Sequence, residues 1–251
     1  MPPSNTGSSA ERSLRLLARL AEEGRALTLA ELAADLGLPK GTAHRLCTQL
    51  LETGFIARDV NERDFMVGPA LRKLAFDTLN HGTVRGLRHQ VLSELVAGIG
   101  ETCNITTLDG ASILYLDRVE APWPWRLTLA VGEHVPLHCT ASGKLFLALL
   151  PFGQRELLIS QLRLTAVTEA TITSSTALRD ECARIAAAGY SVDRQEFIDG
   201  LLAIAVPILD DSGQIRAALA VHAPVSRLSS EQALEKLPAL QDAAQRLSKL
   251  L

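Results

Sequence analysis

A basic and polar stretch that begins at Lys40 has the residue types that contact DNA. No acidic side chain lies between Asp35 and Glu52, so the positive charges of this stretch have no local neutralisation. Short polar and basic side chains near the N-terminus of a helix can contact phosphates and base edges in the major groove. A solvated polar face on a small helical bundle is the alternative interpretation. The residues that we predict to contact DNA are Lys40, Gly41, Thr42, His44, Arg45 and Thr48, together with Arg58 and Arg63 of a following hairpin.

A second candidate site lies at Thr140-Ala141-Ser142, which leads into an apolar stretch with helical character. Thr140 is a suitable N-cap, and the first N–H groups of a helix have no partner within the helix. Such a terminus suits a carboxylate or a phosphate. An ordinary capped helix without a ligand explains the same residues equally well.

Motifs for nucleotide binding and nucleophilic catalysis are incomplete around this site. Ser142-Gly143-Lys144 lacks the earlier glycine of a P-loop, and Leu145 stands where a Ser or Thr would bind magnesium. The GxSxG pattern of a nucleophile elbow is also absent. Cys139 follows His138 directly, and adjacent side chains of an extended segment point to opposite faces. This pair therefore predicts a buried, unreactive thiol, and we predict no catalytic residue.

Three histidines, His134, His138 and His222, are the candidates for a metal site. Pro136 lies between the first two in a stretch that reads as extended, and no carboxylate stands at ligand spacing. The four cysteines lie far apart and form no CxxC pair, which argues against a zinc module. We predict no metal and no cofactor, and reduced cysteines in a cytoplasmic protein.

Capping boxes predict the helices that must position the basic stretch. Ser8 with Glu11 and Thr28 with Glu31 each begin a helix, and a third helix over LPKGTAHRLCTQLLETG ends at Gly54. FIARD and FMVG flank a short polar bend, Val60 to Arg63, and predict a β-hairpin. Together they predict a winged helix-turn-helix domain over residues 10–68, after a flexible tail at 1–9 and before a linker helix at 69–82.

Residues 83–251 predict a second domain that carries the Thr140 site. After Gly100 the apolar period changes to two, as in TCNITTLDGASILYLDRV, where Asp109-Gly110 marks a hairpin turn. RLTLAVG and AIAVPILDDSGQIRAALAVHAP predict further strands. TASGKLFLALLP, TALRDECARIAAAG and a segment from Ser229, divided or kinked at Pro238, predict helices. The predicted fold class is α+β, with an antiparallel sheet and helices packed against it.

The charge of the chain differs between these two parts. The net charge of −3 by itself disfavours nucleic acid as a partner. Residues 1–74, however, hold 10 Lys and Arg against 9 Asp and Glu, whereas residues 75–251 hold 15 against 19. The slightly basic first part is compatible with DNA binding. No apolar run is long enough to cross a bilayer and the polar N-terminus is not a signal peptide, so we expect no membrane partner.

The chain resembles the isocitrate lyase regulator (IclR) family of bacterial transcription factors from about Ser13 to the C-terminus. The resemblance rests on LTLAELAADLGLPKGTAHRLCTQLLETGFIARD and VGPALRKLA in the first part. In the second part it rests on RVEAPWPWRL, VPLHCTASGKLFLA, GYSVDRQEFIDGLLAIAVPILD and LAVHAP. It implies a winged helix-turn-helix, a linker helix and a GAF-like effector domain. The implied partners are operator DNA, a small and often carboxylated effector, and further copies of the chain that form a homodimer and then a tetramer.

The resemblance also implies an effector pocket. Ala203, Ala220 and His222 stand where glyoxylate-responsive members have a cysteine and two serines, which argues against glyoxylate or pyruvate. We expect a more apolar wall and a His222 donor that can be cationic. A larger organic acid, aromatic acids included, would suit this pocket, with Trp123 and Trp125 near its mouth. The residues predicted to bind the effector are Val135, Ala141, Ser142, Asp193, Leu201, Ala203, Ala220 and His222.

We interpret the chain as a ligand-responsive, sequence-specific DNA-binding regulator of a catabolic operon and not as an enzyme. Effector binding would favour one arrangement of the effector domains, and the helix at 69–80 would pass this preference to the recognition helices. One alternative is an enzyme that uses the helix-turn-helix for oligomerisation, which would need a nucleophile, base or metal cluster. Another is a scaffolding protein with a degenerate ligand site.

Overall fold

The computed structural model describes residues 8–59, 62–79, 82–124 and 129–250. The chain forms two compact units, Met1–Thr78 and Leu79–Leu251. The division therefore falls inside the segment 69–82 for which the sequence predicts a linker helix. Within the described ranges, no helix combines the length and the apolar character that a membrane crossing requires.

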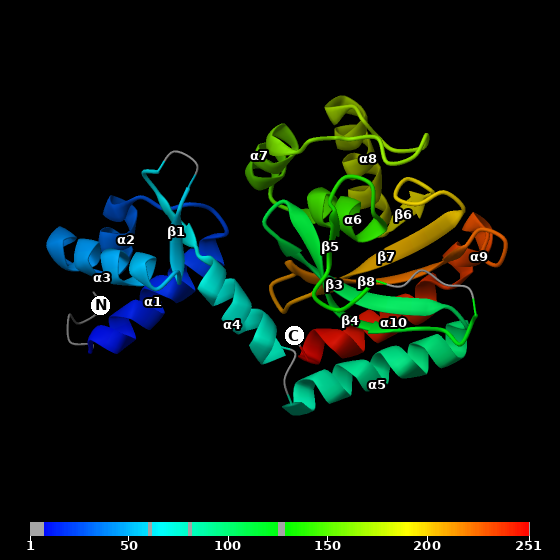
Figure 1. Cartoon of the computed structure of the whole chain (residues 1–251), viewed down its shortest axis with the longest axis horizontal. Coiled ribbons are helices and arrows are strands. Elements are labelled where there is room, and N and C mark those ends of the chain that lie inside the picture. Colours follow the sequence, from blue (N-terminus) through cyan, green and yellow to red (C-terminus); the bar gives the residue numbers. More distant parts are fainter. Residues whose placement is uncertain (1–7, 60–61, 80–81, 125–128, 251) are drawn as a thin grey trace. The chain divides into compact units, whose positions relative to one another are not determined.

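The first unit contains three helices, a two-stranded antiparallel wing and one more helix (Figure 1). Leucines of the three helices meet Ile56 and Phe65 of the wing in a single apolar core. The arrangement confirms the predicted winged helix-turn-helix. The elements are α1 (Ser9–Glu23), α2 (Leu29–Asp35), α3 (Lys40–Glu52), β1 (Ile56–Arg58), β2 (Phe65–Val67) and α4 (Pro69–Leu79).

Side-chain caps begin the first two helices where the sequence predicts them. The Ser8 hydroxyl accepts a hydrogen bond from the N–H of Glu11 at 3.2 Å. Thr28 and Glu31 form a complete capping box, in which each side chain accepts from the other residue's N–H. These caps satisfy N–H groups that have no partner within the helix, so α1 and α2 begin at defined residues.

Gly68 connects the wing to α4 at a close approach of two backbones. A Cβ atom at Gly68 would lie 2.2 Å from the carbonyl oxygen of Gly54, a distance that real Cβ atoms do not adopt. The absence of a side chain therefore allows the chain to turn directly from β2 into α4.

The second unit is a six-stranded antiparallel sheet with helices on both faces (Figure 1). The strand order is β5-β4-β3-β8-β7-β6, so two strands that are distant in the sequence, β3 and β8, pair at the centre. The elements are α5 (Gly82–Ile99), β3 (Thr102–Asp109), β4 (Ser112–Val119), β5 (His134–Pro136), α6 (Ala141–Leu149), α7 (Phe152–Gln161), α8 (Ser175–Ala188), β6 (Ser191–Arg194), β7 (Leu201–Leu209), β8 (Ile215–Pro224), α9 (Ser230–Glu235) and α10 (Leu237–Leu247), followed by a 3-10 turn, Ser248–Leu250.

The helices divide between the two faces of this sheet. Helix α5 packs on β3 and β4, and α10 packs on β7, β8 and α5. Helix α6 covers the opposite face, where it contacts β7, β8 and α8 (Figure 1). The α+β fold class predicted from the sequence is thereby confirmed.

The register of the strands decides which side chains share the face under α6. Asn104 of β3 pairs with Ala220 of β8, and His222 of β8 pairs with Ala203 of β7. Ala203 in turn pairs with Asp193 of β6. Directly opposed residues of antiparallel strands project from the same face, so these side chains come together from four strands.

The structure corrects the predicted strand RLTLAVG. Residues 126–128 lie outside the described residues, and residues 129–132 form no strand. Instead, the N–H of Glu133 donates to the carbonyl oxygen of Ala130 at 3.1 Å, and the Glu133 carboxylate accepts from the N–H of Ala130 at 2.9 Å. This turn follows from Gly132, whose φ of 93° favours glycine.

Other differences from the predicted elements are small. The C-terminal helix divides at Pro238, which lies in the first turn of α10, as the sequence predicts. Helix α7 and strand β6 are additional elements. Strand β6 has only four residues at the edge of the sheet, so its alternation is too short to recognise in the sequence.

Candidate effector pocket and DNA-binding helix

Most of the predicted DNA contacts lie on one face of α3. The opposite face packs Ala43, Leu46 and Cys47 into the core of the first unit. Any amphipathic surface helix has a polar stripe toward solvent above a buried apolar stripe, and a recognition helix needs such an exposed face to enter a groove. The exposed stripe contains Gly41, His44, Arg45 and Thr48 at spacings of three and four residues, with Lys40 exposed in the first turn and Thr42 half-buried beside it.

Three acidic side chains of the first unit, Glu23, Glu31 and Asp35, pair with arginines outside α3. Arg19 Nε contacts Asp35 Oδ2 at 2.7 Å, and Arg25 contacts glutamates of α1 and α2. In the part of the chain that the structure describes, no ion pair involves Lys40 or Arg45. The charges of α3 are therefore available to a polyanion.

Arg58 of the wing has partners within the hairpin. Its guanidinium lies 4.2 Å from the centroid of the Phe65 ring and donates to the carbonyl oxygen of Arg63 at 2.9 Å. These contacts stabilise the wing, so a phosphate contact by Arg58 would have to use its remaining N–H groups. Arg63 is exposed in the turn, whereas residues 60 and 61 of the predicted bend lie outside the described residues.

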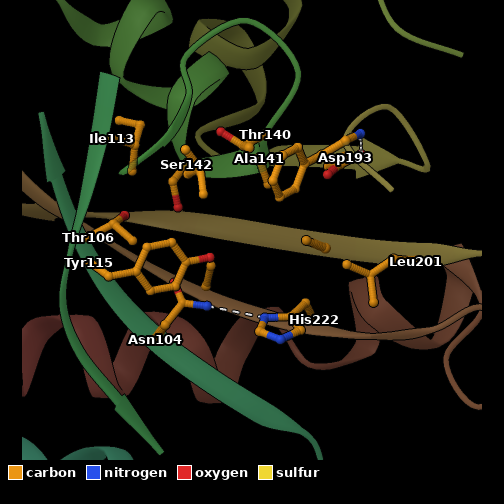
Figure 2. Close-up of a pocket in the computed structure, with 14 residues that line it drawn as sticks. Asn104, Thr106, Ile113, Tyr115, Thr140, Ala141, Ser142, Asp193, Leu201 and His222 are labelled. Carbon is orange, nitrogen blue, oxygen red and sulfur yellow. Dashed lines mark hydrogen bonds between the residues drawn. The ribbon is translucent and has the colours of Figure 1, made fainter. Parts of the chain in front are cut away.

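All eight residues predicted to bind an effector line one cavity of the second unit, beneath α6 (Figure 2). The cavity has a volume of about 30 Å³, which corresponds to roughly two water molecules. Its walls come from the sheet, and its roof comes from the beginning of α6 and the loop after β6. Lining residues that the sequence interpretation did not assign to the pocket are Asn104, Thr106, Ile113, Tyr115, Thr140 and Phe197.

The N-terminus of α6 forms the polar part of the roof. The Thr140 hydroxyl accepts from the N–H of Gly143 at 3.1 Å and donates to the carbonyl oxygen of Pro136 at 2.8 Å. Thr140 therefore caps the helix, as the sequence predicts. Ala141 and Ser142 follow in the first turn, where N–H groups have no intrahelical acceptor, and both line the cavity.

Gly143 allows this helix end to reach its position. A Cβ atom at Gly143 would lie 2.1 Å from the carbonyl oxygen of Leu137. The first turn of α6 therefore lies directly on the backbone of the preceding segment. The glycine that appeared in the incomplete P-loop motif serves packing.

Asp193 of β6 is the acidic residue of the cavity. Its Oδ1 accepts hydrogen bonds from the N–H of Glu196 at 2.7 Å and the N–H of Phe197 at 3.4 Å. Burial, opposed by these hydrogen bonds, raises the pKa of Asp193 to about 7. Near neutral pH the group is therefore present in both protonation states, and the protonated form can donate to an anion.

Behind Asp193 lies a buried lysine. Lys144 of α6 is fully buried; its Nζ donates to the carbonyl oxygen of Val192 at 2.8 Å and pairs with the carboxylate of Glu196. Glu181 of α8 lies 3.7 Å from the same Nζ. Lys144 thus connects α6 to β6, to the loop after β6 and to α8.

His222 differs from the prediction in its charge. The ring is buried, and burial together with the nearby charge of Arg118 lowers its pKa to about 3. The expectation that His222 can be cationic in the pocket is therefore wrong. The imidazole is neutral and lies between two polar partners, the Asn104 amide at 3.2 Å and the Arg118 guanidinium at 3.4 Å.

Two buried polar atoms of β3 have no hydrogen-bond partner within the described ranges. They are the side-chain oxygens of Asn104 and Thr106, whose residues are only 2% and 1% exposed. A buried polar group without a partner costs about 1–3 kcal/mol, and such groups mark places where a ligand or water completes the network. Both residues line the cavity under α6.

The polar character of this face has a signal in the sequence. Asn104 and Thr106 alternate with the buried apolar residues Cys103 and Ile105, as residues on opposite faces of a strand do. The alternation could have indicated a polar inner face of β3. It could not indicate that this face lies opposite α6, because that depends on the pairing with β8.

The other candidate chemistries do not assemble. Burial raises the pKa of Cys139 to about 12, and His138 contacts the carbonyl oxygen of Thr165 at 3.0 Å. Among the described residues, no group of three or more His, Cys, Asp or Glu side chains could hold a metal ion. Trp123 is not among the residues that line the cavity, and its Nε1 donates to the carbonyl oxygen of Gly100 at 2.8 Å. Trp125 lies outside the described residues.

A winged helix-turn-helix followed by a sheet domain whose pocket has both polar and apolar lining residues defines the class of DNA-binding regulators that carry a separate ligand domain. Comparisons with known proteins agree. The family model "IclR helix-turn-helix domain" matches residues 9–60, and "Bacterial transcriptional regulator IclR C-terminal" matches residues 76–249. The chain therefore belongs to the IclR family of bacterial transcriptional regulators, and the prediction that it is not an enzyme is confirmed.

Individual relatives support this assignment. The chain is 39% identical to "Probable transcriptional regulator SauR" of Cupriavidus necator, over 98% of this chain and 97% of that protein. It is 30% identical to "Transcriptional repressor IclR" of Escherichia coli, over 93% and 86% respectively. A solved structure of an IclR homologue from Microbacterium hydrocarbonoxydans, complexed with 4-hydroxybenzoate, is 25% identical with a TM-score of 0.59, and the match covers 97% of this chain and 99% of that one.

Proposed function

We propose that this regulator binds operator DNA through α3 and the wing, and that a small organic acid in the cavity under α6 controls this binding. The observation that carries the proposal is the convergence of polar groups without partners on one cavity. Asn104 and Thr106 approach it from the sheet with side-chain polar ends that have no partner among the described residues. The first turn of α6 approaches it from the opposite side with its positive dipole end.

An acid suits this cavity better than a neutral or cationic ligand. The N–H groups of the first helical turn and the Ser142 hydroxyl can donate to its oxygens. Asp193 does not exclude an anion, because burial raises its pKa to about 7 and the protonated carboxyl can donate as well. We propose that the residues that bind the acid are Val135, Ala141, Ser142, Asp193, Leu201, Ala203, Ala220 and His222.

The volume of the cavity, about 30 Å³, is roughly that of two water molecules, so even a short acid must displace some lining side chains and a larger one must displace more. A short acid is therefore the first candidate, in contrast to the larger acid expected from the sequence. An aromatic acid is the second candidate, because a structural neighbour is complexed with 4-hydroxybenzoate and the walls at Ala203 and Ala220 are apolar. Binding of a ring would require displacement of aromatic side chains that line the cavity.

DNA binding is proposed for the exposed face of α3. Its candidate contacts are Lys40, Gly41, Thr42, His44, Arg45 and Thr48, with Arg58 and Arg63 of the wing. Control by the acid needs only a difference in its affinity for two arrangements of the molecule. A homodimer that assembles to a tetramer and a catabolic operon as the target remain part of the proposal.

The test combines DNA binding with ligand binding on the full chain. Gel shifts use the region upstream of the gene and of its neighbours, with unrelated DNA as the control. Thermal shifts use glyoxylate, pyruvate, benzoate and 4-hydroxybenzoate, each with its neutral amide. We expect specific, salt-sensitive DNA binding that at least one acid alters, while the amides have no effect. An absence of specific binding to all these regions, or a response to none of the acids, would contradict the proposal.

Two variants separate the two activities. Ala203→Leu fills the cavity and should remove the thermal shift and the acid response while DNA binding persists. Arg45→Ala should weaken DNA binding while the acid-induced thermal shift persists. Loss of both activities in both variants would indicate damage to the fold, and intact acid binding in Ala203→Leu would place the ligand elsewhere.

A further inference from the structure

Arg118, His222 and Asn104 form a row of polar groups that ends at the cavity. Asn104 pairs with Arg118 across β3 and β4, and His222 stands two residues along β8 from Ala220, which pairs with Asn104. All three side chains therefore project from the sheet face under α6. His222 Nε2 lies 3.4 Å from Arg118 Nη2. His222 Nδ1 lies 3.2 Å from the Asn104 amide, and Figure 2 shows this contact as a dashed line.

The arginine determines which nitrogen of His222 carries a proton. A guanidinium has N–H donors and no acceptor, and it stays protonated in proteins. The Nε2 atom that faces Arg118 must therefore be the unprotonated nitrogen and accept the hydrogen bond. His222 is neutral, because burial and Arg118 lower its pKa to about 3, so it has one ring proton. That proton resides on Nδ1, which faces Asn104.

The protonated Nδ1 in turn determines the orientation of the Asn104 amide. A donor at Nδ1 requires an acceptor, and the acceptor of an amide is its oxygen. The oxygen and nitrogen of an amide exchange places by a half-turn of the group, and the hydrogen-bond network decides between the two orientations. The oxygen of Asn104 must therefore face His222. The NH₂ group then takes the buried position that has no partner within the described part of the chain.

The opposite orientation would bring donors together. If the NH₂ group of Asn104 faced Nδ1, the proton of His222 would lie on Nε2 and point at the guanidinium of Arg118. Two donors would then face each other in a site where all three residues are less than 10% exposed. A buried donor without an acceptor is unfavourable, and a neighbouring positive charge increases the cost.

We propose that Arg118 and His222 hold the Asn104 amide with its NH₂ group toward the cavity, where it donates to an oxygen of the acid. The proposal rests on the proposed function for its ligand and deepens it, because it assigns a specificity-determining donor on the sheet opposite the N-terminus of α6. A carboxylate has two acceptor oxygens. It can therefore accept from the Asn104 NH₂ group on the sheet and from the N–H groups at the N-terminus of α6. A primary ammonium or the NH₂ of an amide in the same place would meet a donor.

The first experiment locates the proton of His222 and needs no effector. A long-range ¹H–¹⁵N correlation spectrum of the full chain labelled with ¹⁵N-histidine distinguishes the two tautomers, and His222→Gln assigns the signals by their loss. We expect the proton on Nδ1 throughout the range near neutral pH. A proton on Nε2, or a doubly protonated ring, would overturn the proposal.

A second variant tests whether Arg118 determines the tautomer of His222. Arg118→Met retains the length of the side chain but removes its donors, so Nε2 is free to carry the proton. We expect the spectrum to shift toward the Nε2-protonated tautomer, while Arg216→Met, at an exposed ion pair of the same unit, leaves the wild-type tautomer in place. An unchanged tautomer in folded Arg118→Met would show that Arg118 does not set it.

The final experiment tests the donor toward the ligand. Asn104→Asp keeps an acceptor for His222 Nδ1 but places an oxygen where the NH₂ group stood. In titrations with pyruvate and with benzoate, whichever acid binds the wild type should bind Asn104→Asp at least about tenfold more weakly. Unchanged affinity would contradict the proposal. If neither these acids nor the rest of the panel bind the wild type, the proposed function is wrong, and the tautomer measurement still decides the orientation of Asn104.

Discussion

Lys144 of α6 and Glu196 of the loop after β6 form a buried ion pair directly behind the pocket residue Asp193. Lys144 is fully buried and Glu196 is 5% exposed. The N–H of Glu196 donates to Asp193 Oδ1 at 2.7 Å, so the pair fixes the loop that holds the acid of the cavity. It also fixes the helix whose N-terminus forms the roof. The ion pair therefore connects the two polar walls of the pocket.

Removal of the charge of Lys144 should destabilise the second unit. Loss of one partner leaves the other buried charge without compensation, which costs about 3–5 kcal/mol. We expect Lys144→Met to lower the free energy of unfolding by this amount in urea. Both tryptophans lie between residues 79 and 251, so their fluorescence reports on this unit. Arg216→Met at an exposed pair is the control and should change little; equal effects of the two variants would refute a special role for the buried pair.

Gly143 should not tolerate a side chain. Because a Cβ atom would lie 2.1 Å from the carbonyl oxygen of Leu137, Gly143→Ala must displace the start of α6. We expect a loss of about 3 kcal/mol or more in unfolding free energy, together with loss of acid binding. Gly153→Ala in α7, where the new Cβ meets nothing within 4 Å, should be neutral or slightly stabilising. The prediction is wrong if both variants unfold at the same urea concentration.

Asp193 should make the stability of the chain depend on pH. Its pKa is raised to about 7 from 3.8, so between these values the folded chain binds more protons there than the unfolded chain. The free energy of unfolding therefore falls as pH rises through this range. Asp193→Asn removes this contribution and should gain about 2–3 kcal/mol relative to the wild type between pH 5 and pH 8. Urea unfolding of the wild type and of Asp193→Asn at pH 5 and pH 8 measures this difference. An equal change in the free energy of unfolding of both proteins would contradict the prediction.

His222 contributes a slope of the opposite sign in the acid range. Its pKa is lowered from 6.5 to about 3, so below pH 6.5 the unfolded chain takes up a proton that the folded chain does not. Stability should fall as pH decreases toward 3, and His222→Gln should reduce this fall. The comparison of wild type and variant at pH 7 and pH 4.5 tests it, and an identical loss of stability in both would show that His222 is not responsible.

Arg45 should contribute to specific DNA binding. It lies on the exposed stripe of α3 and forms no ion pair in the described part of the chain. If it contacts a base, Arg45→Ala should weaken binding to the operator by about 1–3 kcal/mol and reduce discrimination at that position. Fluorescence anisotropy measures the affinity for the operator, for operators with that base pair changed, and for unrelated DNA. Arg216→Ala in the second unit is the matched control, and an Arg45 variant with control-like affinity would exclude Arg45 from the interface.

Local signals in the sequence were sufficient for much of the fold. The caps at Ser8, Thr28 and Thr140 begin helices where they were predicted, because a cap needs only residues three positions apart. Apolar spacing in the same way predicted the buried face of α3. The strand expected at RLTLAVG failed at residues 129–132, because β-propensity does not account for the turn at Gly132.

The cavity residues also fall into two groups, those that the sequence indicated and those that only the tertiary structure places there. The resemblance to a family placed eight residues in one pocket without reference to contacts. Asn104 and Thr106 were missed, because their position opposite α6 depends on the pairing of β3 with β8, more than 100 residues later in the chain.

The charge of His222 was equally inaccessible, since its pKa depends on burial and on Arg118 of another strand. The sequence by itself determined the helix ends, the order of the elements, the basic stretch and the family, because these depend on neighbouring residues or on whole motifs. Only the tertiary structure decided the volume of the cavity, the protonation of Asp193 and His222, and the polar groups without partners, because desolvation and hydrogen bonding depend on residues that folding brings together.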